Sequence, residues 1–168
     1  MEKILMPVDG SPNARHAARH VINRFMKNGA LEVHLMNVQP AFSRHIANFV
    51  SRGNREDYHR MRSAAALLPV RRMLENSGIP YVVHCEVGDK AALIPDAARR
   101  LRCDRIVMST ARKNSLTRML EDSTTSRVLE ATDVPVEIIA GDAVSPAERF
   151  GIPAGIGAAL ILLLMAAD

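Results

Sequence analysis

The sequence is poor in aromatic residues and lacks any dense run of basic residues. Aromatic side chains make up 4% of the 168 residues, tryptophan is absent, and the formal net charge is only +4. The arginines that provide this excess are scattered along the chain. Side chains for base stacking and a concentrated phosphate-binding patch are therefore both missing, and we expect nucleic acid not to be the main partner.

Cysteine is also scarce. Cys85 and Cys103 lie far apart and form no CxxC pair, a usage typical of a reducing compartment and not of a disulfide-stabilised fold. We expect both to be buried thiols. The opening apolar stretch of about five residues is shorter than the seven or more of a secretory signal, so the expected location is the cytoplasm.

Patterns that carry catalysis are missing too. His16 and His20 have the i, i+4 spacing of metal ligands on one helix face, but no HExxH arrangement and no third ligand accompany them. A solvated helix face is the better interpretation. GxSxG is absent, and no Ser-His-Asp set can be argued. We therefore predict a protein that is not an enzyme and binds no metal.

What the sequence does contain is an alternation of short apolar runs and amphipathic segments. The runs predict five strands, at residues 4–8, 31–38, 81–87, 105–108 and 136–140. Helices are expected between them: from an N-cap at Ser11, over 56–76 with a break or kink at Pro69, after Gly88-Asp89, and over 123–131 with Val128 and Leu129 inward. Residues 41–58 are expected to form a variable connection. Parallel strands need such long crossovers, so the pattern predicts a doubly wound α/β fold with helices on both faces.

Three segments resemble the universal stress protein family, and together they cover residues 1–141. They are ILMPVDGS at 4–11, EVGDKAALIPDAARRLRCDRIVMST at 86–110 and SLTRMLEDSTTSRVLEATDVPVEII at 115–139. The resemblance implies a Rossmann-like, five-stranded parallel sheet in the order 3-2-1-4-5. It also implies dimerisation through the last strand and, depending on the subfamily, either ATP binding or its absence.

The phosphate loop departs from the pattern of the ATP-binding members. There the loop after the fourth strand carries Gly, two residues, Gly, nine residues, then Gly and Ser or Thr; here the same spacing falls on Ser109, Arg112, Asp122 and Ser123. Glycine lets backbone N–H groups approach phosphate oxygens closely. Arg112 would crowd that turn, and the Asp122 carboxylate would repel phosphates by roughly 1–4 kcal/mol at about 4 Å. Asp122 also suits the N-cap of the last helix, and the two interpretations are compatible.

The resemblance assigns the other half of the site residue by residue. Pro7 and Asp9 are similar to the adenosine-side residues, Val38 to the adenine contact, and Met108 to the residue before the phosphate loop. Asp9 has an equally strong interpretation as an Asx-turn residue. For Val38 and Met108, packing in the core is the stronger interpretation. The set describes a vestigial nucleotide site.

The last residues differ in character from the rest. Residues 142–149 form a polar linker, and residues 150–168 carry no charge until Asp168. As a helix, residues 150–167 would span about 27 Å, just short of the roughly 30 Å hydrocarbon core of a bilayer. Two interpretations stay open: docking on protein, or attachment to the cytoplasmic face of a membrane.

Together these observations predict a dimeric stress-response adaptor or signalling protein without catalytic activity, with impaired ATP binding and no cofactor. Strand 136–140 is expected to form the homodimer, because an unpaired apolar sheet edge invites pairing with its own copy. Two alternatives stay open: a sensor that retains weak binding of ATP or another adenine nucleotide, and a membrane-tethered adaptor.

Overall fold

The computed structural model describes residues 1–112 and 124–143, which contain one five-stranded sheet. Every neighbouring pair of strands is parallel, and the order is β3-β2-β1-β4-β5. This order confirms the predicted fold class. The strands are β1 (Glu2–Pro7), β2 (Leu31–Gln39), β3 (Tyr81–Val87), β4 (Arg105–Arg112) and β5 (Val136–Ala143).

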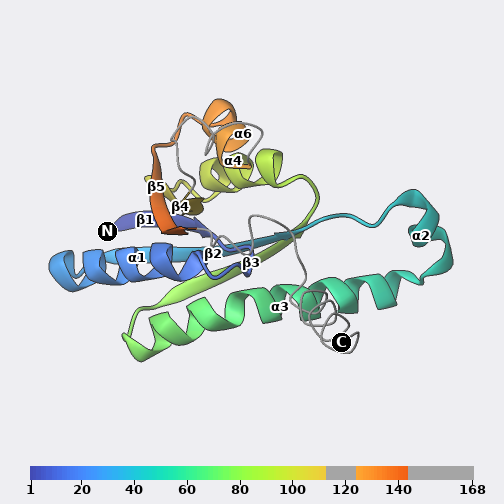
Figure 1. The fold of residues 1–168 in the computed structure, drawn as a ribbon, viewed down its shortest axis with the longest axis horizontal. Helices are drawn as coiled ribbons and strands as arrows, with labels where there is room; N and C mark the ends of the chain where they lie inside the picture. The colour runs from blue at the N-terminus through green and yellow to red at the C-terminus, as the bar shows by residue number, and fades with distance from the viewer. Residues whose placement is uncertain (113–123, 144–168) are drawn as a thin grey trace, which may run out of the picture.

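Helices cover both faces of this sheet (Figure 1). They are α1 (Ala14–Asn28), α2 (Arg44–Phe49), α3 (Arg52–Asn76), α4 (Lys90–Arg100) and α6 (Thr124–Ala131). Because successive strand side chains point to opposite faces, Ile4 and Met6 pack with α1 and α3, whereas Leu5 packs with α4 and α6. The central strand is therefore buried on both sides.

The helix ends follow from local chemistry, with one correction. Gly29 ends α1 in the left-handed region at φ +69° and donates its N–H to the Phe25 carbonyl. Asp89 caps α4 by accepting from the Ala91 N–H at 3.2 Å. The expected cap at Ser11 is wrong: α1 has Asn13 at its N-cap, without a capping hydrogen bond from the side chain.

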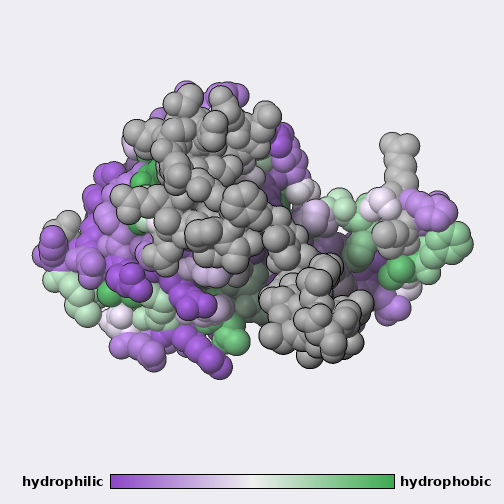
Figure 2. Space-filling model, viewed as in Figure 1, coloured by the Kyte–Doolittle hydropathy of each residue, from purple (hydrophilic) through white to green (hydrophobic). Residues whose placement is uncertain are grey.

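The region predicted as a variable connection contains α2 and the beginning of α3. Helix α3 begins at Arg52, not Glu56, and continues past Pro69 without a break. Its second half packs on the sheet through Leu67, Val70 and Leu74, which offsets the backbone hydrogen bond that proline cannot donate. Its first half and α2 project beyond the sheet as an arm, here residues 40–62 (Figure 1). Figure 2 shows hydrophobic side chains at the free end of the arm.

Two predictions of burial are wrong. Cys85 is exposed, because β3 is the outermost strand and its side chains are only partly covered. Leu129 is 37% exposed whereas its neighbour Val128 is 0% exposed, because the short α6 buries only one narrow face. Cys103 is buried, as predicted, and burial raises the pKa of its thiol to about 11.

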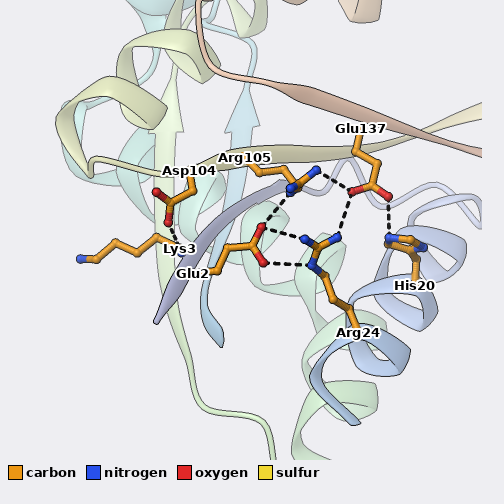
Figure 3. A network of polar contacts seen from close by, with 7 residues as sticks. All are labelled: Glu2, Lys3, His20, Arg24, Asp104, Arg105 and Glu137. Carbon is orange, nitrogen blue, oxygen red and sulfur yellow. Dashed lines mark hydrogen bonds and ion pairs between the residues drawn. The ribbon is translucent and has the colours of Figure 1, made fainter. Parts of the chain in front are cut away.

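A network of ion pairs joins β1, β4, β5 and α1 at the amino ends of the strands (Figure 3). Glu2 accepts hydrogen bonds from Arg24 Nε at 3.0 Å and from Arg105 Nε at 2.9 Å. Arg105 and Arg24 also contact Glu137 at 3.4 and 3.7 Å, and His20 Nε2 lies 2.7 Å from a Glu137 oxygen. Burial alone would raise the pKa of Glu2, but the two arginines together hold it below its ordinary value.

The predicted C-terminal segment, residues 150–168, lies outside the described residues, so docking and membrane attachment both stay predictions. Within the described ranges, no helix has the length and apolar character needed to cross a bilayer. Strand β5 continues to Ala143, two residues into the range predicted as linker.

Candidate functional site

A cavity of about 260 Å³ opens at the carboxyl ends of β1, β2 and β4. This is the point where the sheet order reverses between β1 and β4, the usual ligand position in open α/β sheets. The cavity brings together five residues of the predicted nucleotide site: Pro7, Asp9, Val38, Met108 and Ser109. Residues far apart in sequence therefore share one wall, as the resemblance implies.

The turn after β1 forms one side of the cavity. Asp9 Oδ1 accepts from the Ser11 N–H at 2.9 Å, so its Asx-turn role is real, and Asp9 lines the cavity as well. Gly10 has φ +83°, and a Cβ there would lie 3.1 Å from the Ala66 Cβ of α3. The positive φ favours glycine, and the close approach of Ala66 leaves little room for a side chain between the turn and α3.

Asn37 of β2 holds the same turn in place through buried hydrogen bonds, a role that the sequence pattern did not predict. Its side chain is 1% exposed and donates to the Val8 carbonyl at 2.6 Å. Its Oδ1 accepts from the Ser63 hydroxyl at 2.8 Å and from Gln39 Nε2 at 2.6 Å. The available signal was a polar residue between the apolar Met36 and Val38 in the second half of the strand, because buried polar groups require partners.

Apolar and hydroxyl-bearing side chains divide the cavity wall. The apolar wall consists of Pro7, Val8, Met36, Val38, Ile94 and Met108. The polar side chains that sequence analysis had not selected are Ser11, Asn13, Thr110, Thr124 and Thr125, with Lys90 as a cation. Apolar walls with a few converging polar groups are typical of sites that bind small molecules. The volume of about 260 Å³ lies just under the roughly 300–1,000 Å³ of typical ligand pockets.

Two of the four predicted phosphate-loop positions lie in a strand, and the other two lie outside the described residues. Ser109 and Arg112 both belong to β4, where Ser109 pairs with Ile139 and Arg112 with Ala143 of β5. The expected end of this strand at Met108 is therefore wrong by four residues, with an irregularity between Thr110 and Arg112. Both positions therefore lie in the paired strand and not in a loop. Asp122 and Ser123 lie outside the described residues.

An ion pair at the rim connects α6 to α4. Arg127 donates two hydrogen bonds to the Asp89 carboxylate, at 2.6 and 3.3 Å. The hydrogen bond from Arg127 is the main cause that lowers the pKa of Asp89. Because Asp89 also caps α4, this contact holds the beginnings of two cavity-lining helices at a fixed separation.

A second cavity, of about 390 Å³, adjoins the first. It shares Asp9, Val38 and Lys90 with it and adds Arg62 of α3. Within residues 1–112 and 124–143, no group of three histidine, cysteine or acidic side chains is placed to hold a metal ion. His20 instead contacts Glu137, so the pairing of His16 with His20 as metal ligands receives no support from the geometry.

Comparison with known proteins agrees with this architecture. The model of the universal stress protein family matches residues 1–140. The chain belongs to the universal stress protein family. A universal stress protein of Methanocaldococcus jannaschii, MJ0531, is 29% identical over 143 residues, which cover 82% of this chain and 81% of that protein. Members of the family are generally stress-response proteins and commonly form homodimers.

Solved structures of other universal stress proteins share the fold. UspA from Lactobacillus plantarum superposes with a TM-score of 0.64 at 23% identity, covering 82% of this chain and 97% of that one. An Arabidopsis thaliana family protein, solved with AMP bound, gives a TM-score of 0.61 at 14% identity, covering 92% and 97%. At these identities the likeness shows the fold alone.

Proposed function

We propose that this universal stress protein is a dimeric stress-response adaptor or signalling protein, without catalytic activity, whose binding of ATP is impaired. One observation carries the proposal. Ser109 and Arg112, at the positions of phosphate-loop glycines in the ATP-binding members, are paired with β5. Pairing in the sheet and a Cβ at both positions leave the backbone there less freedom to turn N–H groups toward a polyphosphate than loop glycines have.

The charges around the cavity support the same conclusion. Asp9 contributes a carboxylate, and Lys90 is the cation among the described lining residues. A triphosphate carries several negative charges, and each like-charge pair at about 4 Å costs roughly 1–4 kcal/mol, equivalent to about fivefold to a thousandfold in affinity. An unmodified nucleoside avoids this repulsion. Because repulsion grows with the number of phosphates, the expected affinity falls from adenosine through AMP to ATP.

The alternative is an adenine-nucleotide sensor with weak binding, and one specific observation favours it. Lys90 lies between the two cavities and Arg62 lines the second, so phosphate groups could be held by these cations without a glycine loop. The AMP bound to the Arabidopsis relative makes a mononucleotide the relevant probe.

Calorimetric titration with adenosine, AMP and ATP tests the proposal. We expect ATP to bind at least about tenfold more weakly than AMP, or not measurably. A variant with Ser109, Arg112 and Asp122 all replaced by glycine should gain ATP affinity. Ser77→Gly, at the end of α3 and far from the cavity, is the matched control. Low-micromolar ATP binding by the unaltered protein would overturn the proposal in favour of the sensor.

The dimer is proposed to form through β5, which pairs with β4 on one side only in the chain described here. Ile138 on this strand is 36% exposed. An Ile138→Pro substitution removes a donor from the edge strand and should convert the dimer to a monomer in light scattering. Ile138→Val, which keeps the N–H, is the control. A folded, dimeric Ile138→Pro protein would place the interface elsewhere.

A further inference from the structure

Another cavity, here called the arm cavity, lies between the arm and the end of β3. Its volume is about 330 Å³, within the roughly 300–1,000 Å³ of typical ligand pockets. It shares no lining residue with the two cavities described above. Its lining residues include Phe42 after β2, Val87 at the end of β3, and Arg52, Arg55, Glu56 and His59 in the first turns of α3.

Two nitrogen atoms of these lining residues have no hydrogen-bond partner among the described residues. They are Arg55 Nε and His59 Nδ1, and both atoms are buried. A guanidinium nitrogen can only donate, and an imidazole Nδ1 donates in one neutral tautomer and in the charged form. Because buried polar groups in folded proteins almost always have a partner, the two nitrogens point to an acceptor inside the cavity.

The charges of the cavity wall favour a negatively charged acceptor. Arg52 Nε donates to Glu56 Oε1 at 2.7 Å, so these two opposite charges offset each other. Arg55 forms no ion pair within the part of the chain that the structure describes. The wall therefore keeps a net positive charge at Arg55. A guanidinium group binds carboxylates and phosphates through strong, charge-assisted hydrogen bonds.

The same cavity also has an apolar surface. The Phe42 ring contacts the rings of His59 and Tyr58, with centroid distances of 4.8 and 5.2 Å. These ring contacts hold Phe42 in place beside the basic residues. Val87, which is 47% exposed, adds an aliphatic side chain from the end of β3. A ligand that combines an oxyanion with a small apolar body would use both kinds of surface.

We propose that the arm cavity binds a small molecule with a carboxylate or phosphate group on a short apolar or aromatic body. The oxyanion accepts hydrogen bonds from Arg55 and His59, and the apolar body lies against Phe42 and Val87. Residues four apart lie on one face of a helix, so Arg55 and His59 can contact the same oxyanion. The site is separate from the proposed nucleotide cavity and can be occupied whether or not that cavity binds a nucleotide.

NMR titration of the full chain tests the site directly. The probes are phenyl phosphate, benzoate and the neutral benzyl alcohol. We expect millimolar phenyl phosphate or benzoate to shift the ring nitrogen signals of His59, and the stronger of the two probes identifies the preferred oxyanion. His45 is the control, because it lies on α2 and stacks on Phe49 at a centroid distance of 5.3 Å, outside the cavity lining.

Three results of this titration would overturn the proposal. If neither oxyanion shifts His59, water fills the cavity and satisfies the two nitrogens. Equal shifts at His45 and His59 would mean that the probes bind the arm without a site. An equal response to benzyl alcohol would show an apolar cavity that does not recognise charge.

Two variants test the residues that hold the oxyanion. Arg55→Met keeps an unbranched side chain that suits a helix, and His59→Phe keeps a ring against Phe42, but each removes the donor. Each should weaken binding of the preferred probe at least about tenfold in calorimetry, with an unchanged urea midpoint as the check on folding.

Arg60→Met is the matched control for charge. It removes the same charge from the same helix, but Arg60 donates to Asp57 at 2.7 Å and does not line the cavity. We expect it to change affinity less than about twofold, and a loss equal to that of Arg55→Met would reduce the effect to diffuse attraction. Displacement of the probe by adenosine would place the probe in the nucleotide cavity and contradict the proposal.

Discussion

At the amino ends of β1, β4 and β5 the charged side chains are paired with one another, whereas at the carboxyl ends of β1, β2 and β4 polar side chains line a cavity. At the amino ends, four charged side chains form ion pairs with one another: Glu2, Arg24, Arg105 and Glu137. At the carboxyl ends, Asp9 and Lys90 are the charged residues among the described residues that line the cavity. Ion pairs occupy the amino end of the sheet. At the carboxyl end, the buried hydrogen bond from Asn37 to the Val8 carbonyl supports the turn that borders the cavity.

The largest effect is expected at the carboxyl end, at Asn37. An Asn37→Leu substitution leaves the buried Val8 carbonyl and the Ser63 hydroxyl without a partner, which costs about 2–4 kcal/mol of unfolding free energy. Urea denaturation measures it. Gln39→Leu removes only one hydrogen bond to Asn37 and should cost about 1 kcal/mol. If the two variants were equally stable, Asn37 would not be the support of the turn.

A smaller loss of unfolding free energy is expected at the amino ends of the strands. Arg105 bridges Glu2 and Glu137, and its side chain is 30% exposed. Partial solvent screening limits the loss in Arg105→Met to about 1–2 kcal/mol, and high salt should reduce the difference from the wild type. Arg52→Met breaks a pair in which the arginine is 86% exposed and should cost less than about 0.5 kcal/mol. Equal losses in the two variants would mean that the network adds nothing beyond a surface pair.

The smallest effects concern pH. The pKa values of Glu2 and Asp89 are both lowered, so each stabilises the fold above its unfolded pKa, and the stabilisation is lost as pH falls through the lower folded value. NMR titration of the side-chain carboxyl carbons measures both values. Salt should return Asp89 toward its ordinary pKa more than Glu2, because exposed charges are screened more strongly. A larger salt shift at Glu2 would reverse the comparison.

Much of the fold and the nucleoside side of the cavity could be predicted from local pattern and from the family resemblance. Pro7 and Val38 lie in the carboxyl-terminal parts of strands with clear apolar runs, and Asp9 follows the first of them. Met108 ends the apolar run of β4. Parallel topology brings these strand ends to one edge of the sheet. The five-strand order followed in the same way. These features depend on neighbours in sequence, or on a topology with few alternatives.

The features that sequence missed depend on distant partners. Residues 109–112 look like the start of a polar loop, and only pairing with β5 makes them strand. Asn37 is explained by Ser63 on another element. Cys85 looked like a core residue because an edge strand has the same apolar composition as a central one. The arm was missed because α3 has apolar residues on both faces, which removes the single periodic stripe that indicates a surface helix.

The position of β1 in the middle of the sheet also has a consequence for synthesis on the ribosome. Its pairing with β2 joins Glu2 to Leu31, but its pairing with β4 joins Ile4 to Arg105. The first three strands can therefore assemble once residue 87 has emerged, while the other edge of β1 waits for residues 105–112. During that interval a central strand with the apolar residues Ile4, Leu5 and Met6 has an open edge, which is the condition under which nascent chains aggregate or recruit chaperones.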